Sequence, residues 1–131
     1  MRYESKKHSW SDERVATEYD ERRFRSWLQR WKHRRDVALV LRLMRRSGAY
    51  GRVLDMPCGT ARLFPELEAA GCTMVGADLS REMMRASKHR NGSGVGFVQA
   101  EGERLPFRNG AVGAVVCMRF LFHVDARMAQ T

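Results

Sequence analysis

Three acidic residues, Asp55, Asp78 and Glu101, are the side chains in this sequence best placed to bind a ligand. Each follows the end of a short apolar segment, directly or within two residues. If these segments are parallel strands, their carboxyl ends meet at one edge of a sheet, where open α/β sheets bind ligands. A carboxylate accepts hydrogen bonds from hydroxyl and amine groups and repels phosphate. The pattern therefore predicts a ligand that offers hydroxyls, amines or a positive charge.

The residues after the first acid form a short loop, 56–60, ahead of a helical pattern. A strand, a loop of small residues and a helix bring backbone N–H groups close to a ligand. Asp78 follows Gly59 by 78 − 59 = 19 residues, a spacing at which an acid accepts both hydroxyls of a ribose. Glu101 could accept from an exocyclic amine such as that of adenine, and the Gly102 N–H could reach a ring nitrogen. The alternatives are an ordinary strand-to-helix turn and solvated loop acids.

The hydropathy pattern predicts the elements that would carry these residues. We expect strands at 52–56, 73–77, 95–99 and 111–117, and helices at 61–70 and after the capping residue Ser80. Strands that alternate with helices are typical of a parallel sheet with right-handed crossovers, so the expected fold class is α/β. The segment 111–117 has no polar side chain, which is typical of a central strand covered on both faces.

The N-terminal part is expected to be helical, with one helix over 11–20 and a longer one over 24–47. The longer helix ends at Ser47-Gly48, where glycine is a favourable C-cap. Apolar residues recur along it at three- and four-residue steps, which predicts one packed stripe. The stripe comprises Phe24, Trp27, Leu28, Trp31, Ala38, Leu41 and Met44. We therefore interpret the tryptophans as packing residues.

The positive charge is concentrated in this N-terminal part. The net charge is +9; residues 1–50 hold 14 Lys and Arg against 7 Asp and Glu, and residues 51–131 hold 10 against 8. We expect a basic helical arm at 1–49, which could meet nucleic acid, acidic lipid or an acidic partner. A solvated helix face is the simpler interpretation. Because no nucleic-acid recognition motif accompanies the arm, nucleic acid is not an expected partner.

Composition excludes several classes of protein. The 131 residues fit one domain, and we expect neither a membrane span nor a secretory signal. Cys58, Cys72 and Cys117 show neither disulfide nor metal spacing, so we expect no metal site. We expect a reducing, cytoplasmic location for the same reason. The glycine fingerprint of nicotinamide-dependent dehydrogenases is absent, because Ala61 and Phe64 stand where its later glycines would be.

Three segments together resemble the class I S-adenosylmethionine-dependent methyltransferases, in particular the ubiquinone and menaquinone methyltransferases. They are Val53–Thr60, Val75–Ser80 and Gln99–Phe107. The resemblance implies a Rossmann-like parallel sheet in the order 3-2-1-4 with helices on both faces. It also implies S-adenosylmethionine as cofactor and a small molecule as methyl acceptor.

The resemblance further implies individual cofactor contacts. It places Asp55 and the Cys58–Gly59 backbone at the methionine end, Asp78 on the ribose and Glu101 on the adenine amine. The other implied contacts are Thr60, Leu79, Gly102 and, from an N-terminal cover, Tyr19. No catalytic residue is assigned, because the cofactor itself supplies the electrophile. His123 could act as a base, and a packed neutral histidine is the alternative.

The sequence departs from the family pattern in the loop and at two acids. Where the family usually has three glycines, the loop holds Pro57, Gly59 and Ala61. Glu101 and Gly113 stand where the family usually has aspartate. The single glycine leaves the backbone less free to approach a ligand.

The family's sheet has seven strands, and this sequence provides four. Residues 50–131 therefore match the N-terminal half of such a domain, and two hypotheses stay open. The chain is a methyltransferase domain, or it is a truncated, catalytically inactive relative that binds a cofactor or a partner. The fourth strand would be an edge, so we expect self-association or a partner there.

Overall fold

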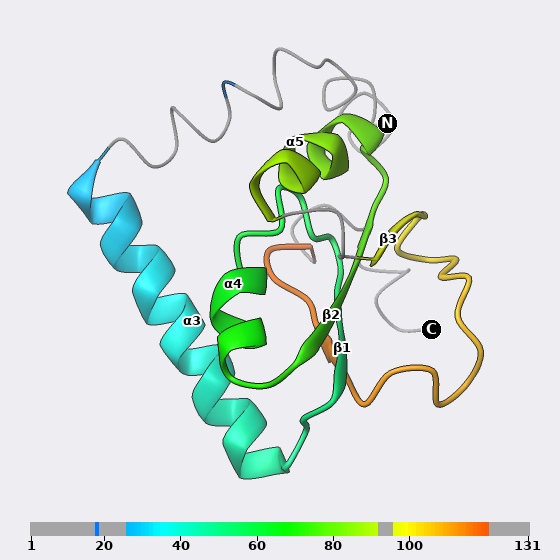
Figure 1. Cartoon of the computed structure of the whole chain (residues 1–131), viewed down its shortest axis with the longest axis horizontal. Coiled ribbons are helices and arrows are strands. Elements are labelled where there is room, and N and C mark those ends of the chain that lie inside the picture. The colour runs from blue at the N-terminus through cyan, green and yellow to red at the C-terminus, as the bar shows by residue number, and fades with distance from the viewer. Residues whose placement is uncertain (1–17, 19–25, 92–95, 121–131) are drawn as a thin grey trace.

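The computed structural model describes residues 18, 26–91 and 96–120 (Figure 1). The elements in chain order are α3 (Trp27–Ser47), β1 (Arg52–Asp55), α4 (Phe64–Ala69), β2 (Thr73–Asp78), α5 (Arg81–Asn91), β3 (Gly96–Gln99) and β4 (Ala114–Val116). Of the helix expected over 11–20, only residue 18 is described; Tyr19 and His123 lie outside the described residues.

The four strands form one parallel sheet in the order β3-β2-β1-β4. Leu54 of β1 is in register with Val75 of β2 on one side and with Val115 of β4 on the other. Within the described residues, β4 is therefore an edge strand. The predicted α/β fold and strand order are confirmed.

The sheet has two apolar faces, because successive residues of a strand point to opposite sides. Val53 of β1 packs in a cluster that also contains Val40 of α3, Phe64 of α4 and Met84 of α5. Figure 1 shows α3 and α4 on the same side of β1 and β2. The other face carries Leu54, Met56 and Ala77, which pack against Val75, Leu105, Phe107, Val112 and Phe120. Within the described ranges the helices cover one face, and the second helical layer that we expected would have to come from residues outside them.

Helix α3 begins and ends as its capping residues predict. The Ser26 Oγ accepts a hydrogen bond from the Gln29 N–H at 3.3 Å, and Gly48 adopts a left-handed conformation with φ of 65°. At the start of α5, the Met83 N–H donates to the Ser80 Oγ at 3.2 Å, which confirms Ser80 as a cap.

No helix of the described part has the length and apolar character needed to cross a membrane.

The predicted packing of Trp27 and Trp31 is wrong. Their exposed fractions are 73% and 52%, whereas Val37, Val40 and Met44 are the buried residues of α3. Each residue turns a helix by about 100°, which places both tryptophans more than about 90° from the centre of the buried stripe. Both stripes recur at helical steps, and contact with the sheet decided which one is buried.

Two predicted elements are shorter in the structure. Helix α4 begins at Phe64 instead of residue 61, because Ala61 adopts a φ of 53°, outside the helical region. Strand β4 covers 114–116 instead of 111–117. It pairs with residues 53–55 of the short strand β1, which limits its length.

Candidate cofactor-binding site

The loop after β1 is held over the carboxyl edge of the sheet by backbone hydrogen bonds. The Met56 N–H donates to the Val116 carbonyl oxygen of β4 at 3.0 Å, and the Cys58 N–H donates to the Ala77 carbonyl oxygen of β2 at 2.9 Å. Loop 56–59 therefore spans the ends of three strands. These two hydrogen bonds join main-chain atoms only.

Asp78 joins this loop to the end of β2. Its Oδ2 accepts a hydrogen bond from the Gly59 N–H at 2.8 Å, and its Oδ1 accepts one from the Ser80 N–H at 2.9 Å. Gly59 has a φ of 51°, and a Cβ added to it would meet no atom within 4 Å. The sequence spacing assigns Asp78 to ribose hydroxyls, and its hydrogen bond to the Gly59 N–H is a further contact that the structure adds. Since a carboxylate has about four acceptor sites, the two used here leave room for ligand hydroxyls.

Asp55 lies buried at the end of β1, with 3% of its surface exposed. Burial, together with the nearby charge of Asp78, raises its pKa to about 8. Without a ligand the carboxyl is therefore largely protonated at neutral pH. A positive charge placed beside it would favour the ionised form, which fits the predicted ligand chemistry.

Cys58 is not a nucleophile in this arrangement. Its thiol is buried, and burial and the charges of Asp78 and Asp55 raise its pKa above the ordinary value. Among the described residues, no group of three or more His, Cys, Asp or Glu side chains could hold a metal ion. The site therefore offers hydrogen-bond acceptors and backbone donors.

The stability of the chain should depend on the protonation of Asp55. Its pKa is about 8 in the folded state and 3.8 in an unfolded chain. Between these two pH values the folded state therefore holds a proton that the unfolded state has lost. This contribution is complete below pH 3.8 and is lost as the pH rises to about 8. We expect the wild type to lose up to about 1.4 kcal/mol per pH unit relative to Asp55→Asn in this range.

Urea unfolding of both proteins across the pH series measures this difference. The variant removes the titrating group and leaves every other acid in place, so effects common to the two proteins cancel. Parallel stability curves would contradict the assigned pKa.

Glu101 and Gly102 lie on a turn beside the end of β2. The Ala100 N–H donates to the Asp78 carbonyl oxygen at 3.0 Å, and Glu101 forms an isolated bridge with Arg104. The Glu101 side chain is exposed. A Cβ on Gly102 would lie 2.5 Å from the Phe120 ring, so any larger residue would have to displace this ring and packing favours glycine there. No local sequence pattern indicates this close contact.

The remaining predicted contacts are placed as follows. Thr60 is buried in the loop, and Leu79 is half-buried after β2. The Leu79 carbonyl oxygen accepts a hydrogen bond from the Gln99 side chain at 3.0 Å. The structure thus places every described member of the predicted set at one edge of the sheet, either at the end of a strand or on a loop that follows one.

Comparison with known proteins identifies the family. A sequence model for a methyltransferase domain matches residues 54–130, which is more than half of the chain. The chain belongs to the methyltransferase-domain family. The matched range contains Asp55, Asp78 and Glu101, and it leaves out α3.

Curated relatives of this methyltransferase domain are demethylmenaquinone methyltransferases. The protein of Corynebacterium urealyticum is 34% identical over 91 residues, which cover 70% of this chain and 34% of the relative. That of Corynebacterium efficiens is 41% identical over 64 residues, which cover 49% of this chain and 26% of the relative. The chain thus spans about a quarter to a third of the length of these relatives.

Solved structures support the fold. The SAM-bound magnesium protoporphyrin IX methyltransferase of Synechocystis PCC 6803 aligns with a TM-score of 0.66 and 20% identity, over 94% of this chain and 66% of that chain. The SAM-bound amino pentose methyltransferase CalS10 of Micromonospora echinaspora aligns with a TM-score of 0.52 and 21% identity, over 72% of this chain and 42% of that chain. At these identities the likeness establishes the fold alone.

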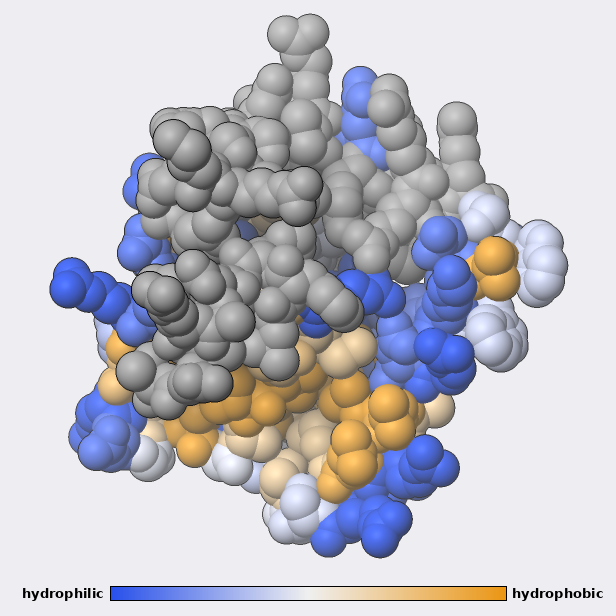
Figure 2. All heavy atoms as spheres, turned by 180° about the vertical axis from the view of Figure 1, so that it is seen from behind, coloured by the Kyte–Doolittle hydropathy of each residue, from blue (hydrophilic) through white to orange (hydrophobic). Residues whose placement is uncertain are grey.

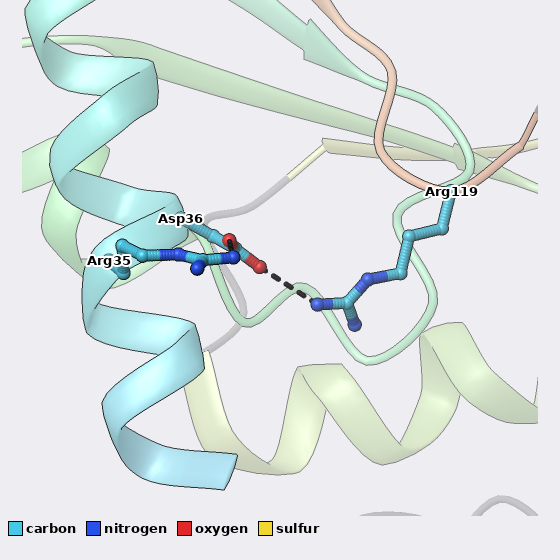
Figure 3. A network of polar contacts seen from close by, with 3 residues as sticks. All are labelled: Arg35, Asp36 and Arg119. Atoms are coloured by element: carbon cyan, nitrogen blue, oxygen red, sulfur yellow. Dashed lines mark hydrogen bonds and ion pairs between the residues drawn. The ribbon is translucent and has the colours of Figure 1, made fainter. Parts of the chain in front are cut away.

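An ion pair that the sequence analysis missed joins α3 to the loop after β4. The Arg119 Nη2 lies 2.8 Å from the Asp36 Oδ2, and the Arg35 Nη2 lies 3.8 Å from the Asp36 Oδ1 (Figure 3). Arg119 has a φ of 63°, unusual for a residue with a side chain. The pair ties the methyltransferase domain's edge loop to the N-terminal helix. Its only sequence signal was that Asp36 is the one acid in α3.

Proposed function

We propose that this methyltransferase domain binds S-adenosylmethionine at the carboxyl edge of its sheet and transfers the methyl group to a small-molecule acceptor. The observation that carries the proposal is the hydrogen bond of 2.8 Å between the Gly59 N–H and the Asp78 Oδ2. It joins the loop that would face the methionine end to the acid that would face the ribose. The demethylmenaquinone methyltransferases among the relatives support a small-molecule acceptor.

The residues present fit the cofactor. Open space at Gly59 allows a ligand to approach the backbone, and Asp78 keeps free acceptor sites for the ribose hydroxyls. Glu101 and the Gly102 N–H would meet the adenine. The remaining proposed contacts are Cys58 and Thr60 in the loop, Leu79 after β2, and Tyr19 from the N-terminal arm.

The chain's own residues would orient the reactants and exclude water. The bound cofactor supplies an electrophilic methyl group, so the protein needs no nucleophile. Asp55 would ionise next to the positive charge of the ligand, and its proton would leave to solvent. Cofactor binding should therefore release a proton near neutral pH, since the pKa of Asp55 is about 8 without ligand.

A division of the chain into a basic arm, 1–49, and a half-domain, 50–131, remains our proposal from composition. Three residues of α3 share the core cluster of the second unit, so the arm would be anchored to it. The cysteines, free in the structure, fit a reducing compartment, and we propose a cytoplasmic location.

Equilibrium dialysis with methyl-labelled S-adenosylmethionine tests the function. We expect retention of the label by the full chain and its displacement by S-adenosylhomocysteine. A demethylmenaquinol then serves as the first acceptor. Transfer of label would establish the methyltransferase activity. Retention without transfer to this or other small molecules would favour the inactive cofactor-binding module instead.

We further propose that a neighbouring chain covers the edge of β4. Within the described residues β4 pairs only with β1, and Val115 is 54% exposed. An uncovered apolar edge favours association with a second copy or a partner. Light scattering across a concentration series should show association that Val115→Lys reduces. A monomer at every concentration would contradict the self-association.

A further inference from the structure

We propose that the exposed face of α3 docks the protein on an anionic lipid surface. We define this cationic face by two groups of exposed α3 residues. The apolar group is Trp27, Leu28, Trp31, Leu39 and Leu43. The basic group is Arg30, Lys32, Arg34, Arg35, Arg42, Arg45 and Arg46. The inference does not depend on cofactor binding.

The apolar residues of the cationic face are the first reason. Of the seven large hydrophobic residues exposed in the described part of the chain, five lie on α3. Leu43 is 56% exposed, and both tryptophans are exposed by more than half. Single exposed apolar residues are common, but a group of them on one element marks an interaction surface.

The charge pattern is the second reason. Seven cations lie on α3, and its one acid, Asp36, is paired with Arg119. Successive residues of a helix are about 100° apart around its axis. An arc of about 160° on α3 therefore contains Trp27, Trp31 and Leu43, and it also contains the cations Lys32 and Arg42. Figure 2 shows hydrophobic side chains among strongly hydrophilic ones on the side that α3 occupies.

This combination suits a bilayer surface. Tryptophan and leucine insert at the boundary between head groups and acyl chains, and lysine and arginine extend towards lipid phosphates. The Arg35 guanidinium lies 5.4 Å from the centre of the Trp31 ring, so one residue pair already presents both chemistries side by side. α3 is also the outermost element on its side of the sheet (Figure 1). A planar surface could therefore reach it.

The composition of the cationic face favours lipid over the other candidates. Single-stranded nucleic acid is bound by cations with aromatic platforms, and the exposed leucines would have no role there. Burial under another protein would remove the clustered cations from water, which is costly unless each is paired. At a bilayer the apolar groups enter the interface while the cations stay hydrated beside phosphate.

Vesicle flotation with the full chain tests the proposal. We expect binding to vesicles of phosphatidylcholine with phosphatidylglycerol, weak binding to phosphatidylcholine alone, and loss of binding at high salt. Trp27→Ser with Trp31→Ser should weaken binding at least tenfold. Arg42→Gln with Arg46→Gln should weaken it roughly fivefold for each charge removed. These side chains are exposed, so circular dichroism should show an unchanged fold.

A matched control removes two exposed cations from other elements, Arg85→Gln with Arg108→Gln. It should keep most of the binding, since these residues lie outside α3. Equal loss in the control would show attraction by net charge alone and overturn the assignment to α3. Equal binding to both vesicle types, or no effect of the tryptophan variant, would overturn it as well. Preferential binding of single-stranded RNA that depends on the tryptophans would replace lipid with nucleic acid.

Discussion

Replacement of Phe64 by alanine is expected to lower the free energy of unfolding by about 3–5 kcal/mol. The Phe64 side chain is fully buried, and its ring stacks on Phe97 with centroids 5.6 Å apart and an angle of 6° between the planes. It lies in the cluster where α3, α4 and the sheet meet. Removal of the ring would leave a cavity that the surrounding residues close only in part. Because domains of this size are stable by about 5–15 kcal/mol, the variant should lose a large part of its stability.

Urea unfolding followed by circular dichroism measures this loss. Tyr50→Ala is the matched control, since Tyr50 is an exposed aromatic residue at the end of the α3–β1 connection. It should cost less than about 1 kcal/mol. A loss at Phe64 as small as that of the control would show that the core cluster around Phe64 is not formed.

Replacement of Asp78 by alanine should weaken S-adenosylhomocysteine binding by about 1–3 kcal/mol, roughly five- to 150-fold. The change removes both proposed acceptors for the ribose hydroxyls. It also removes the acceptor of the Gly59 N–H at 2.8 Å, so the loop loses one of its links to β2 and keeps the hydrogen bond from the Cys58 N–H to the Ala77 carbonyl oxygen. The variant would thus lose the ribose acceptors and the hydrogen bond to the Gly59 N–H together.

Calorimetric titration of the variant measures the effect, and Glu68→Gln is the control. Glu68 is an exposed acid on α4, away from the sheet edge. The affinity of the Glu68→Gln protein for S-adenosylhomocysteine should therefore match that of the wild type. An unchanged dissociation constant in a folded Asp78→Ala protein would exclude Asp78 from the cofactor site.

The sequence allowed prediction of the features that depend on local pattern. Alternating strands and helices predicted the α/β fold, and the family resemblance supplied the strand order. The strand pattern placed the loop around Gly59 and the acid Asp78 at one edge of the sheet, where the structure joins them by a hydrogen bond. Capping by Ser80 and Gly48 was equally local. These features need little knowledge of the rest of the chain.

The features that depend on tertiary packing were not predictable in this way. Helical periodicity proposed a stripe through Trp27 and Trp31, but the sheet buries Val37 and Val40 instead. Gly102 was predicted as a donor, and its contact with the Phe120 ring became visible only in three dimensions.

The ion pair between Arg119 and Asp36 could not be predicted from the sequence either. Arg119 and Asp36 are separated by 83 residues, and no local pattern connects them. Basic residues surround Asp36 in the sequence, so the identity of its partner depends on where the loop after β4 lies.

Isothermal titration of the full chain with S-adenosylhomocysteine, and with NAD as comparison, tests the central claim most directly. The account predicts saturable binding of S-adenosylhomocysteine, proton release that depends on Asp55, and no comparable binding of NAD. A folded chain that gives no binding of S-adenosylhomocysteine, or that binds NAD equally well, would contradict a cofactor site built on Asp78 and the Gly59 loop.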